Sequence, residues 1–189
     1  PEMTRFSIQV DQGPNSGIWV EGVGVTQGDQ VEVTGPVVDD SGRLMIWATA
    51  MTVIATDAAL PEPEVLTTFE AANDDWEGVL IEVTATCTQP ELGYGEWGID
   101  DGTGMLRVDD LGYVYESPIE GLEYRVRGPL DYSFDDFKIA LRGVGDVVLV
   151  DPCSVVTCDE SPVSSCDGNS VISYESTGTC TDGICNYAS

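Results

Sequence analysis

Two stretches of the chain share one order of glycine, strand-like residues and glycine-proline. Residues 28–36 read Gly, six residues, then Gly-Pro, and residues 121–129 repeat that spacing. Between the glycines, residues 30–34 and 122–127 alternate between apolar and polar, which is the period of a β strand with one buried face. Glycine suits the turn into such a strand, and Gly-Pro is expected to interrupt its hydrogen-bond ladder. The repeat therefore restricts the chain to two similar β units.

Four further pairs of segments match in the same order around these two stretches, so we treat the repeat as real. Five short strands with a Gly-rich turn between the second and the third are typical of a small Greek-key barrel of the OB type. The matching segments, first unit before second, are 6–8 with 97–99, 17–20 with 104–108, 43–46 with 136–139, and 53–57 with 147–151.

Alternation with turn punctuation predicts strands throughout both units. The first set is 6–10, 17–20, 30–34, 43–48 and 51–55, and the second set is 79–86, 96–99, 105–108, 122–127, 137–141 and 147–150. A helical turn is expected within residues 64–76. The predicted domains are residues 1–60 (first unit, incomplete), 61–77 (linker), 78–152 (second unit) and 153–189 (Cys-rich disulfide module). The predicted fold class is all-β, with two tandem OB-like Greek-key barrels and a disulfide-rich C-terminal tail.

The first unit lacks a counterpart of the strand at 79–86, because only Pro1 to Arg5 precede Phe6. A barrel without its first strand exposes unpaired edges and part of its core. Three explanations are open: truncation of the sequence at its N-terminus, a strand supplied by the tail or by another chain, or an incomplete sheet. The second would be assembly by β-strand addition, which gives a filament when it runs head to tail without closing.

Charge and composition exclude several functions. The chain has 34 acidic and 7 basic residues, a formal charge of −27, and no histidine. Ser-His-Asp and Cys-His catalysis and His-ligated metal sites are therefore impossible. An acidic surface repels phosphates, so no nucleic-acid partner is expected. No apolar run approaches the roughly 20 residues of a membrane span. The acidity fits either a solvated surface in a salty environment or carboxylates that bind divalent cations.

Six cysteines point to disulfides in an oxidising, extracellular compartment. Five of them lie within the last 37 residues, among Ser, Thr and Gly. The two CxxC pairs of a zinc ribbon are missing, and the spacing leaves the connectivity open. The cysteines are Cys87, Cys153, Cys158, Cys166, Cys180 and Cys185.

Paired carboxylates give a candidate Ca²⁺ site, the only cofactor the sequence suggests. Hard cations bind clustered oxygens, and an Asp-Asp-Gly-Thr-Gly segment starts at residue 100. The same residues also suit a β turn, so both interpretations are open. The candidate ligands are Asp100, Asp101, Asp109 and Asp110.

Exposed aromatic side chains could form a stacking surface for bases or sugars. The candidates are Trp19, Tyr94, Tyr113 and Tyr115, with packing in a core or interface as the competing interpretation. Arg125 and Arg127 share one face of a predicted strand, and we expect them to pair with Glu123 or a nearby Asp.

Two resemblances follow from these segments. Residues 97–108, 121–128 and 137–139 resemble the OB-like repeats of secreted bacterial surface and nuclease-associated proteins, and the likeness covers roughly residues 5–152. It implies the fold and an ancillary role. The tail from Asp151 to Tyr187 resembles Cys-rich repeats of secreted myxobacterial-type proteins, which occur in longer chains, so this chain is expected to be a fragment.

The sequence thus predicts a non-catalytic extracellular structural or assembly protein, a filament or surface-layer subunit that assembles by β-strand complementation. Its expected partners are further copies of itself or other surface proteins. The alternative is an accessory binding module of a larger secreted nuclease or other hydrolase.

Overall fold

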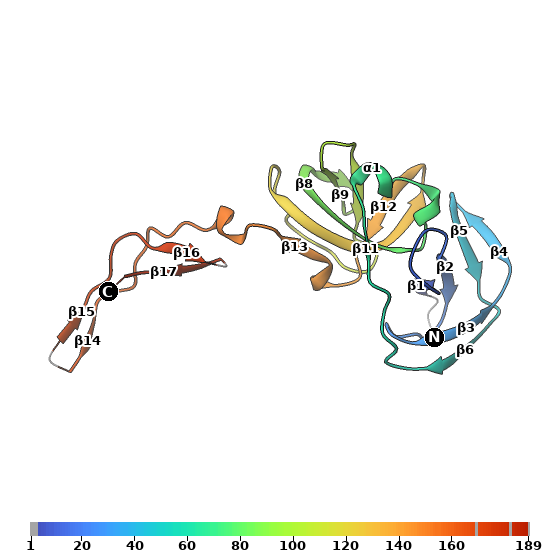
Figure 1. Ribbon diagram of the computed structural model, residues 1–189, viewed down its shortest axis with the longest axis horizontal. Helices are drawn as coiled ribbons and strands as arrows, with labels where there is room; N and C mark the ends of the chain where they lie inside the picture. Colours follow the sequence, from blue (N-terminus) through green and yellow to red (C-terminus); the bar gives the residue numbers. More distant parts are fainter. Residues whose placement is uncertain (1–3, 169, 182, 189) are drawn as a thin grey trace. The chain divides into compact units, whose positions relative to one another are not determined.

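Nearly all regular structure in the chain is β strand (Figure 1). The computed structural model describes residues 4–168, 170–181 and 183–188. One compact unit runs to Val148 and a second begins at Leu149. Helix is confined to short turns, among them α1 (Thr68–Ala71) and η1 (Asp74–Trp76) within the predicted 64–76 segment. The prediction of an all-β chain is confirmed at this level.

Five strands of residues 80–140 close into a ring, and we call residues 80–149 the second half. In the ring β8 pairs with β9, β9 with β10, β10 with β12, and β12 with β11, which returns to β8. Only the β10–β12 pair is parallel. The strands are β8 (Leu80–Gly93), β9 (Glu96–Asp100), β10 (Leu106–Asp109), β11 (Glu123–Ser133) and β12 (Asp136–Ala140), with β7 (Glu64–Val65) beside β8 and β13 (Val147–Leu149) beside β11.

The interior of the ring holds most of the core. Successive side chains on a strand point to opposite faces, so alternate residues of β8 face inward. The inward residues of β8 and of the other strands are almost completely buried. Trp97 and Tyr124 meet there edge to face, with ring centroids 5.4 Å apart. The inward β8 residues are Ile81, Val83, Ala85 and Cys87.

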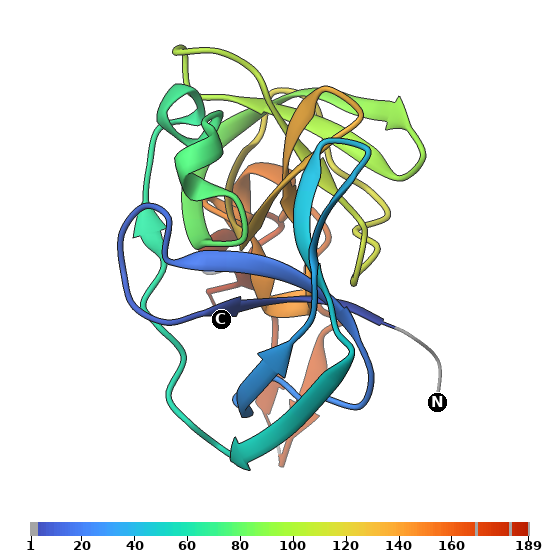
Figure 2. The same ribbon diagram turned by 90° about the vertical axis from the view of Figure 1, so that its right-hand side faces the viewer.

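The first half, residues 4–55, repeats these pairings without closing (Figure 2). β1–β2 is antiparallel like β9–β10, β2–β5 is parallel like β10–β12, and β4–β5 is antiparallel like β11–β12. A separate pair, β3–β6, completes the half. The strands are β1 (Thr4–Gln9), β2 (Gly17–Gly22), β3 (Gln30–Thr34), β4 (Val37–Asp40), β5 (Arg43–Trp47) and β6 (Ala50–Ala55).

The two Gly-Pro dipeptides serve a close backbone approach. A side chain at Gly35 would collide with the carbonyl oxygen of Trp47, and one at Gly128 with that of Ala140. Gly-Pro separates β3 from β4, as expected, but β11 continues through Gly128 and Pro129. The predicted interruption is therefore wrong for the second half, because β11 remains paired with β8 as far as Pro129.

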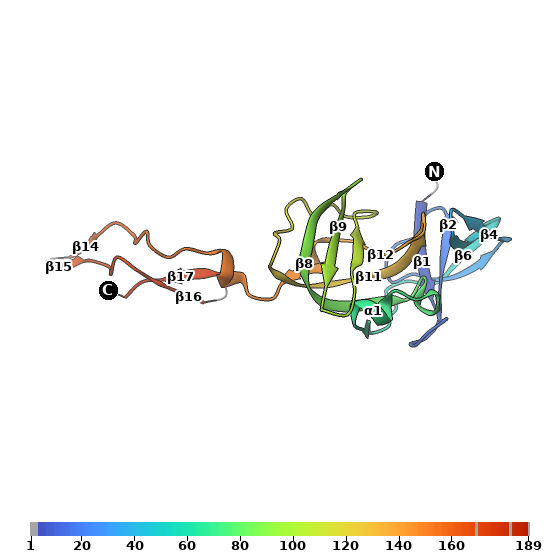
Figure 3. The ribbon, with the colours of Figure 1, turned by 90° about the horizontal axis from the view of Figure 1, so that it is seen from above.

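A buried polar joint connects the two halves, where β5 of the first half contacts β11 of the second; Figure 3 shows the ribbons of the two halves side by side. Trp19 Nε1 donates to the Leu130 carbonyl oxygen at 2.9 Å. Arg43 forms a two-bond ion pair with Asp131, one bond being Nη2 to Oδ2 at 2.7 Å, and its guanidinium lies 5.5 Å from the centre of the Trp19 ring. Met45 packs beside Trp19. The buried Arg43–Asp131 ion pair and the hydrogen bond from Trp19 thus hold the first half against β11.

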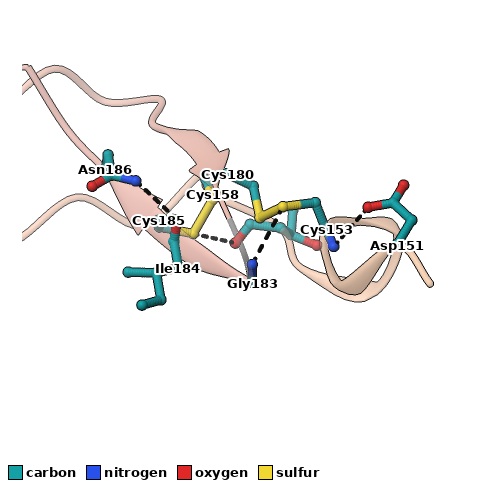
Figure 4. Close-up of a disulfide and its surroundings, with 9 residues drawn as sticks. Asp151, Cys153, Cys158, Cys180, Gly183, Ile184, Cys185 and Asn186 are labelled. Carbon is teal, nitrogen blue, oxygen red and sulfur yellow. Dashed lines mark hydrogen bonds between the residues drawn. A yellow bond between two sulfur atoms is a disulfide. The ribbon is translucent and has the colours of Figure 1, made fainter. Parts of the chain in front are cut away.

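Two disulfides cross-link the C-terminal unit (Figure 4). Cys153–Cys180 and Cys158–Cys185 hold one extended segment against a hairpin, and Cys180 and Cys185 face each other across that hairpin. The hairpins are β14 (Ser165–Asp167) with β15 (Ser170–Ile172), and β16 (Thr179–Thr181) with β17 (Ile184–Asn186). A short 3-10 helix, η3 (Pro152–Val155), begins after Asp151, whose carboxylate accepts from Cys153 N at 3.0 Å.

The disulfide prediction is confirmed for these four cysteines and corrected for the other two. Cys87 is a free thiol because its alternate position on β8 points it into the core of the second half, and burial raises its pKa. Cys166 is a free, exposed thiol on β14, opposite Val171.

Candidate strand-docking slot in the first half

The place that β8 fills in the second half holds no strand among the described residues of the first half. β8 pairs with β11 through residues 80–86 and with β9 through residues 86–93. The counterparts of these two neighbours are β3 and β1. β1 is an edge strand of the four-stranded sheet, and β3 pairs with β6 alone. We call the gap between the outer edge of β1 and the unpaired edge of β3 the open slot.

β6 does not occupy the open slot, because it lies along the other edge of β3. The ladder between β4 and β5 continues past the Gly-Pro kink: Trp47 N donates to Pro36 O at 3.0 Å and Thr49 N to Thr34 O at 2.8 Å. β6 follows β5 in the chain and lies along the same edge, beside β3. Its repeat counterpart, β13, also lies beside β11 rather than in the place of β8. Among the described residues, no strand therefore pairs with the slot-facing edge of β1 or of β3.

The apolar side chains that face the slot are only half-buried. Phe6, Ile8, Val31 and Val33 are all partly exposed. Val53, on the same face of β6 as Val31, is 41% exposed. The repeat-matched residues of the closed ring are at most 2% exposed; they are Trp97, Ile99, Tyr124 and Val126. The difference follows from the missing strand, since the residue types are similar.

A shallow hollow of about 220 Å³ lies beside this face, at the end of β2 and the start of β6. Its walls carry no charged side chain, although the chain as a whole is strongly acidic. A side chain at Gly22 would contact Phe6 and Met51, which places the hollow next to the slot-facing residues. The lining residues are Gly22, Val23, Gly24, Ala48, Thr49, Ala50, Met51 and Val53.

The strand β3, which borders the slot, carries a negative charge where the matching strand β11 carries a positive one. On β8 the outward Glu82 accepts from Arg127 Nη2 at 2.6 Å and lies 4.0 Å from Arg125 Nε. The expected pairing of these arginines with Glu123 or an Asp is thus corrected, because β8 brings Glu82 opposite them. The repeat places Glu32 where β11 has Arg125. Glu32 is exposed and has no ion-pair partner within the described chain.

Asp100 and Asp101 hold a turn together. Asp100 Oδ1 accepts from Gly102 N at 2.7 Å, and the Asp101 carboxylate accepts from both the backbone N–H and the hydroxyl of Thr103 and of Thr68. Desolvation opposes ionisation of Asp101, but the bonds from Thr103 and Thr68 outweigh it and lower its pKa to about 2. These contacts are what the β-turn interpretation expects.

Asp109 and Asp110 serve other contacts. Burial raises the pKa of Asp109, whose carboxylate lies 3.7 Å from Lys138 Nζ. Asp110 lies against Gly95, where any side chain would collide with its carboxylate. Across the described residues, no three or more His, Cys, Asp or Glu side chains are grouped so that they could hold a metal ion. Calcium binding stays a prediction.

The four aromatic candidates do not form one surface. Trp19 is 2% exposed in the joint between the halves, so its expected exposure is wrong: its apolar ring and N–H are both used there. Tyr115 packs 5.9 Å from both Trp97 and Tyr124. Tyr113 is half-buried, and Tyr94 is 99% exposed at the turn between β8 and β9.

Comparison with protein-family models, with curated proteins and with solved structures gave no match to this chain. Over the residues that the structure describes, no helix is long and apolar enough to cross a membrane. The open slot is the structural feature that bears most directly on function. The sequence indicated that a strand is missing beside β1, but it did not indicate that this strand would also lie beside β3. The available sequence signal for β3 was that the repeat has Glu32 where the second half has Arg125.

Proposed function

We propose that this chain is a non-catalytic extracellular structural protein that assembles by β-strand complementation. In this proposal the open slot receives an extended strand and the first half becomes a closed ring. One observation carries it: the same strand pairings close around β8 in the second half and stay open in the first. The two disulfides fit the oxidising environment that an extracellular protein meets.

Both halves are proposed to be OB-like barrels, the first lacking one strand. The ring order of the second half, with a single parallel pair, supports this, since it is that of a five-stranded Greek-key barrel. A relation to the OB-like repeats of secreted bacterial surface proteins is part of the same proposal.

The energetics favour an occupant with apolar side chains. Ordering a free strand costs about 1–2 kcal/mol per residue. Backbone pairing with β1 and β3 offsets part of this cost, and burial of apolar surface at about 25 cal/mol per Å² supplies the rest. Phe6, Ile8, Val31 and Val33 offer that surface. A polar strand would pair with the edges without closing the core.

Hydrogen exchange of β1 tests the proposal. In the isolated protein the amides of Thr4–Gln9 that point away from β2 should exchange quickly, because that edge of β1 lacks a strand partner. In assembled material from the natural source the same amides should exchange at least about tenfold more slowly. β9, which has strands on both sides, is the internal control and should stay protected in both samples. Equal exchange of β1 in the two samples contradicts the proposal.

A further inference from the structure

The open slot has properties that identify the class of strand it takes. We infer that its occupant is a basic segment, apolar at alternate positions, rather than a strand taken from the described residues of a second copy of this chain. This inference rests on the proposed function and adds the chemistry of the partner. It follows from three observations, on side-chain pattern, on local charge and on the strands that this chain has available.

The side-chain pattern comes from β8, the strand that fills the matching place. Its inward residues are Ile81, Val83, Ala85 and Cys87, four apolar side chains at alternate positions, all at most 1% exposed. The walls they would meet in the first half are of the same kind, with Val33 in the position of Val126 and Ile8 in that of Ile99. An occupant must therefore present apolar side chains at every second residue.

Local charge sets the outward positions of the occupant. β8 carries Glu82 opposite Arg127 and diagonal to Arg125, and both arginines suit an acidic strand. In the first half those positions are Glu32 and Thr34, so an acidic strand would face a carboxylate instead of a guanidinium. Opposite charges on neighbouring strands are favourable and like charges are unfavourable. A Lys or Arg is therefore expected where β8 has Thr84, the position opposite Arg125, because Glu32 takes the place of Arg125 in the first half.

The wider surroundings of the slot have the same sign. Residues 4–57 contain seven acidic and two basic residues. Both basic residues are already paired: Arg5 lies 3.2 Å from Glu21 and 2.7 Å from Asp40, and Arg43 binds Asp131. No cation of the first half is left to meet an acidic occupant. A basic occupant is attracted by the uncompensated carboxylates.

A second copy of this chain fits poorly. Each copy carries a formal charge of −27, and two such copies repel at low ionic strength. The alternating strands of residues 4–149 are already paired within their own sheets. In the described residues beyond Leu149, no segment has four apolar residues at alternate positions. A donor strand from a second copy would have to leave its own fold.

The test is peptide binding to the intact chain, measured by fluorescence anisotropy. The probe is a labelled synthetic peptide with Val at four alternate positions and Lys between them. Its matched partner has Glu in place of Lys, and a third peptide has the composition of the first with its Val residues clustered. At low salt we expect the Lys peptide to bind at least about tenfold more tightly than either, and the margin over the Glu peptide to shrink as salt screens the charges.

Charge reversal in the slot ties this preference to its site. Glu32→Arg should remove or reverse the preference for Lys over Glu. Glu116→Arg makes the same change in charge at an exposed residue between β10 and β11, and it should leave the preference intact. Both positions are exposed, so both variants should fold. An unchanged preference in Glu32→Arg overturns the inference.

The remaining outcomes separate this inference from the proposed function. If the Glu peptide binds as tightly as the Lys peptide, the slot takes strands but the partner class is wrong. If the purified chain assembles alone and protects β1, the occupant is a second copy, which overturns the inference and leaves the proposed function standing. If no alternating peptide binds and β1 exchanges equally fast in assembled material, both fail.

Discussion

The two halves of the N-terminal unit share their strand pairings but differ in one strand, and that strand decides how much of each half is buried. Val33 and Val126 are the same residue at the same repeat position, yet Val126 is fully buried and Val33 is partly exposed. Ile8 and Ile99 show the same contrast. Residue type at an inward position is therefore not sufficient for a core; the ring must also close around it.

The outer faces of the two halves differ as well. Trp19 and Met45 lie side by side on β2 and β5, and they are buried in the joint. At the matching positions of β10 and β12 stand Arg107 and Lys138, both bound to the buried Glu96. At these two positions the first half thus places side chains that dock against the second half, whereas the second half places two cations that bind its own Glu96.

Removing one member of the joint should have the largest effect. Asp131→Ala leaves Arg43 buried without its carboxylate, and we expect a loss of about 3–5 kcal/mol in the free energy of unfolding. Urea denaturation measures this loss. Asp40→Ala removes only a partly exposed carboxylate 3.9 Å from Arg43 and should cost less than about 1 kcal/mol. Similar losses for the two variants would show that the joint does not depend on the buried pair.

Truncation of matched inward residues should reproduce the contrast between the halves. Ile99→Ala leaves a cavity in the closed ring and should cost about 2–5 kcal/mol. Ile8→Ala should cost less than half as much, because the Ile8 side chain is already partly in water. Thermal and urea unfolding of the two variants measures both values. Equal costs would mean that the first half is closed in solution.

Closing the slot within one chain should make the interior of the first half as well buried as that of the second half. We expect attachment of a second copy of residues 80–95, with Lys in place of Glu82, ahead of Thr4 to supply a strand and turn, and to stabilise the protein by about 2 kcal/mol through added apolar burial. The same attachment with Ser at its inward positions is the control and should not stabilise. In the closed variant, Ile8→Ala should become as costly as Ile99→Ala.

The pH dependence of the joint gives a smaller effect. Burial, together with the nearby carboxylates of Asp131 and Asp74, raises the pKa of Glu77 to about 7, although Leu44 N donates to its carboxylate at 2.9 Å. Because the folded-state pKa is above the ordinary value of 4.5, this group favours folding at low pH, and that contribution is lost as pH rises from about 4.5 to about 7.

Glu77→Gln should remove this dependence. The variant should match the parent protein near pH 5 and exceed it by about 1 kcal/mol at pH 8, a value reduced for the partial exposure of the side chain. A series of unfolding curves from pH 5 to pH 8 measures the difference. A variant that is less stable than its parent at pH 8 would contradict the assignment.

The turn at Asp101 should give the smallest effect. Asp101→Asn keeps the shape of the side chain but weakens its bonds to Thr68 and Thr103, at a cost of about 1 kcal/mol at pH 7. Since the pKa of Asp101 is lowered, this contribution is present above its ordinary pKa and is lost as pH falls toward 2. Parent and variant should therefore converge in acid, which unfolding curves at pH 7 and pH 3 can check.

Local pattern predicted most strands, and contacts decided where they end. The range 30–34 agrees with β3, and 96–99 and 137–141 agree with β9 and β12 within a residue. β4 was missed because Val37–Asp40 is short and ends in two aspartates. β8 and β11 extend beyond their predicted ranges, since each continues for as long as it has a neighbour to pair with.

The candidate site divides in the same way. Residue order and spacing alone predict the repeat, the charge reversal from Arg125 to Glu32 and the Cys-rich tail, and they show that residues 1–5 are too few to match the strand at 79–86. Only the tertiary structure decided that β6 lies on the far edge of β3, that Trp19 and Cys87 are buried, and that Glu82 meets Arg127. Those facts depend on pairing between residues far apart in the chain, and the period of a strand sets which face a residue occupies but not which strand comes to lie beside it.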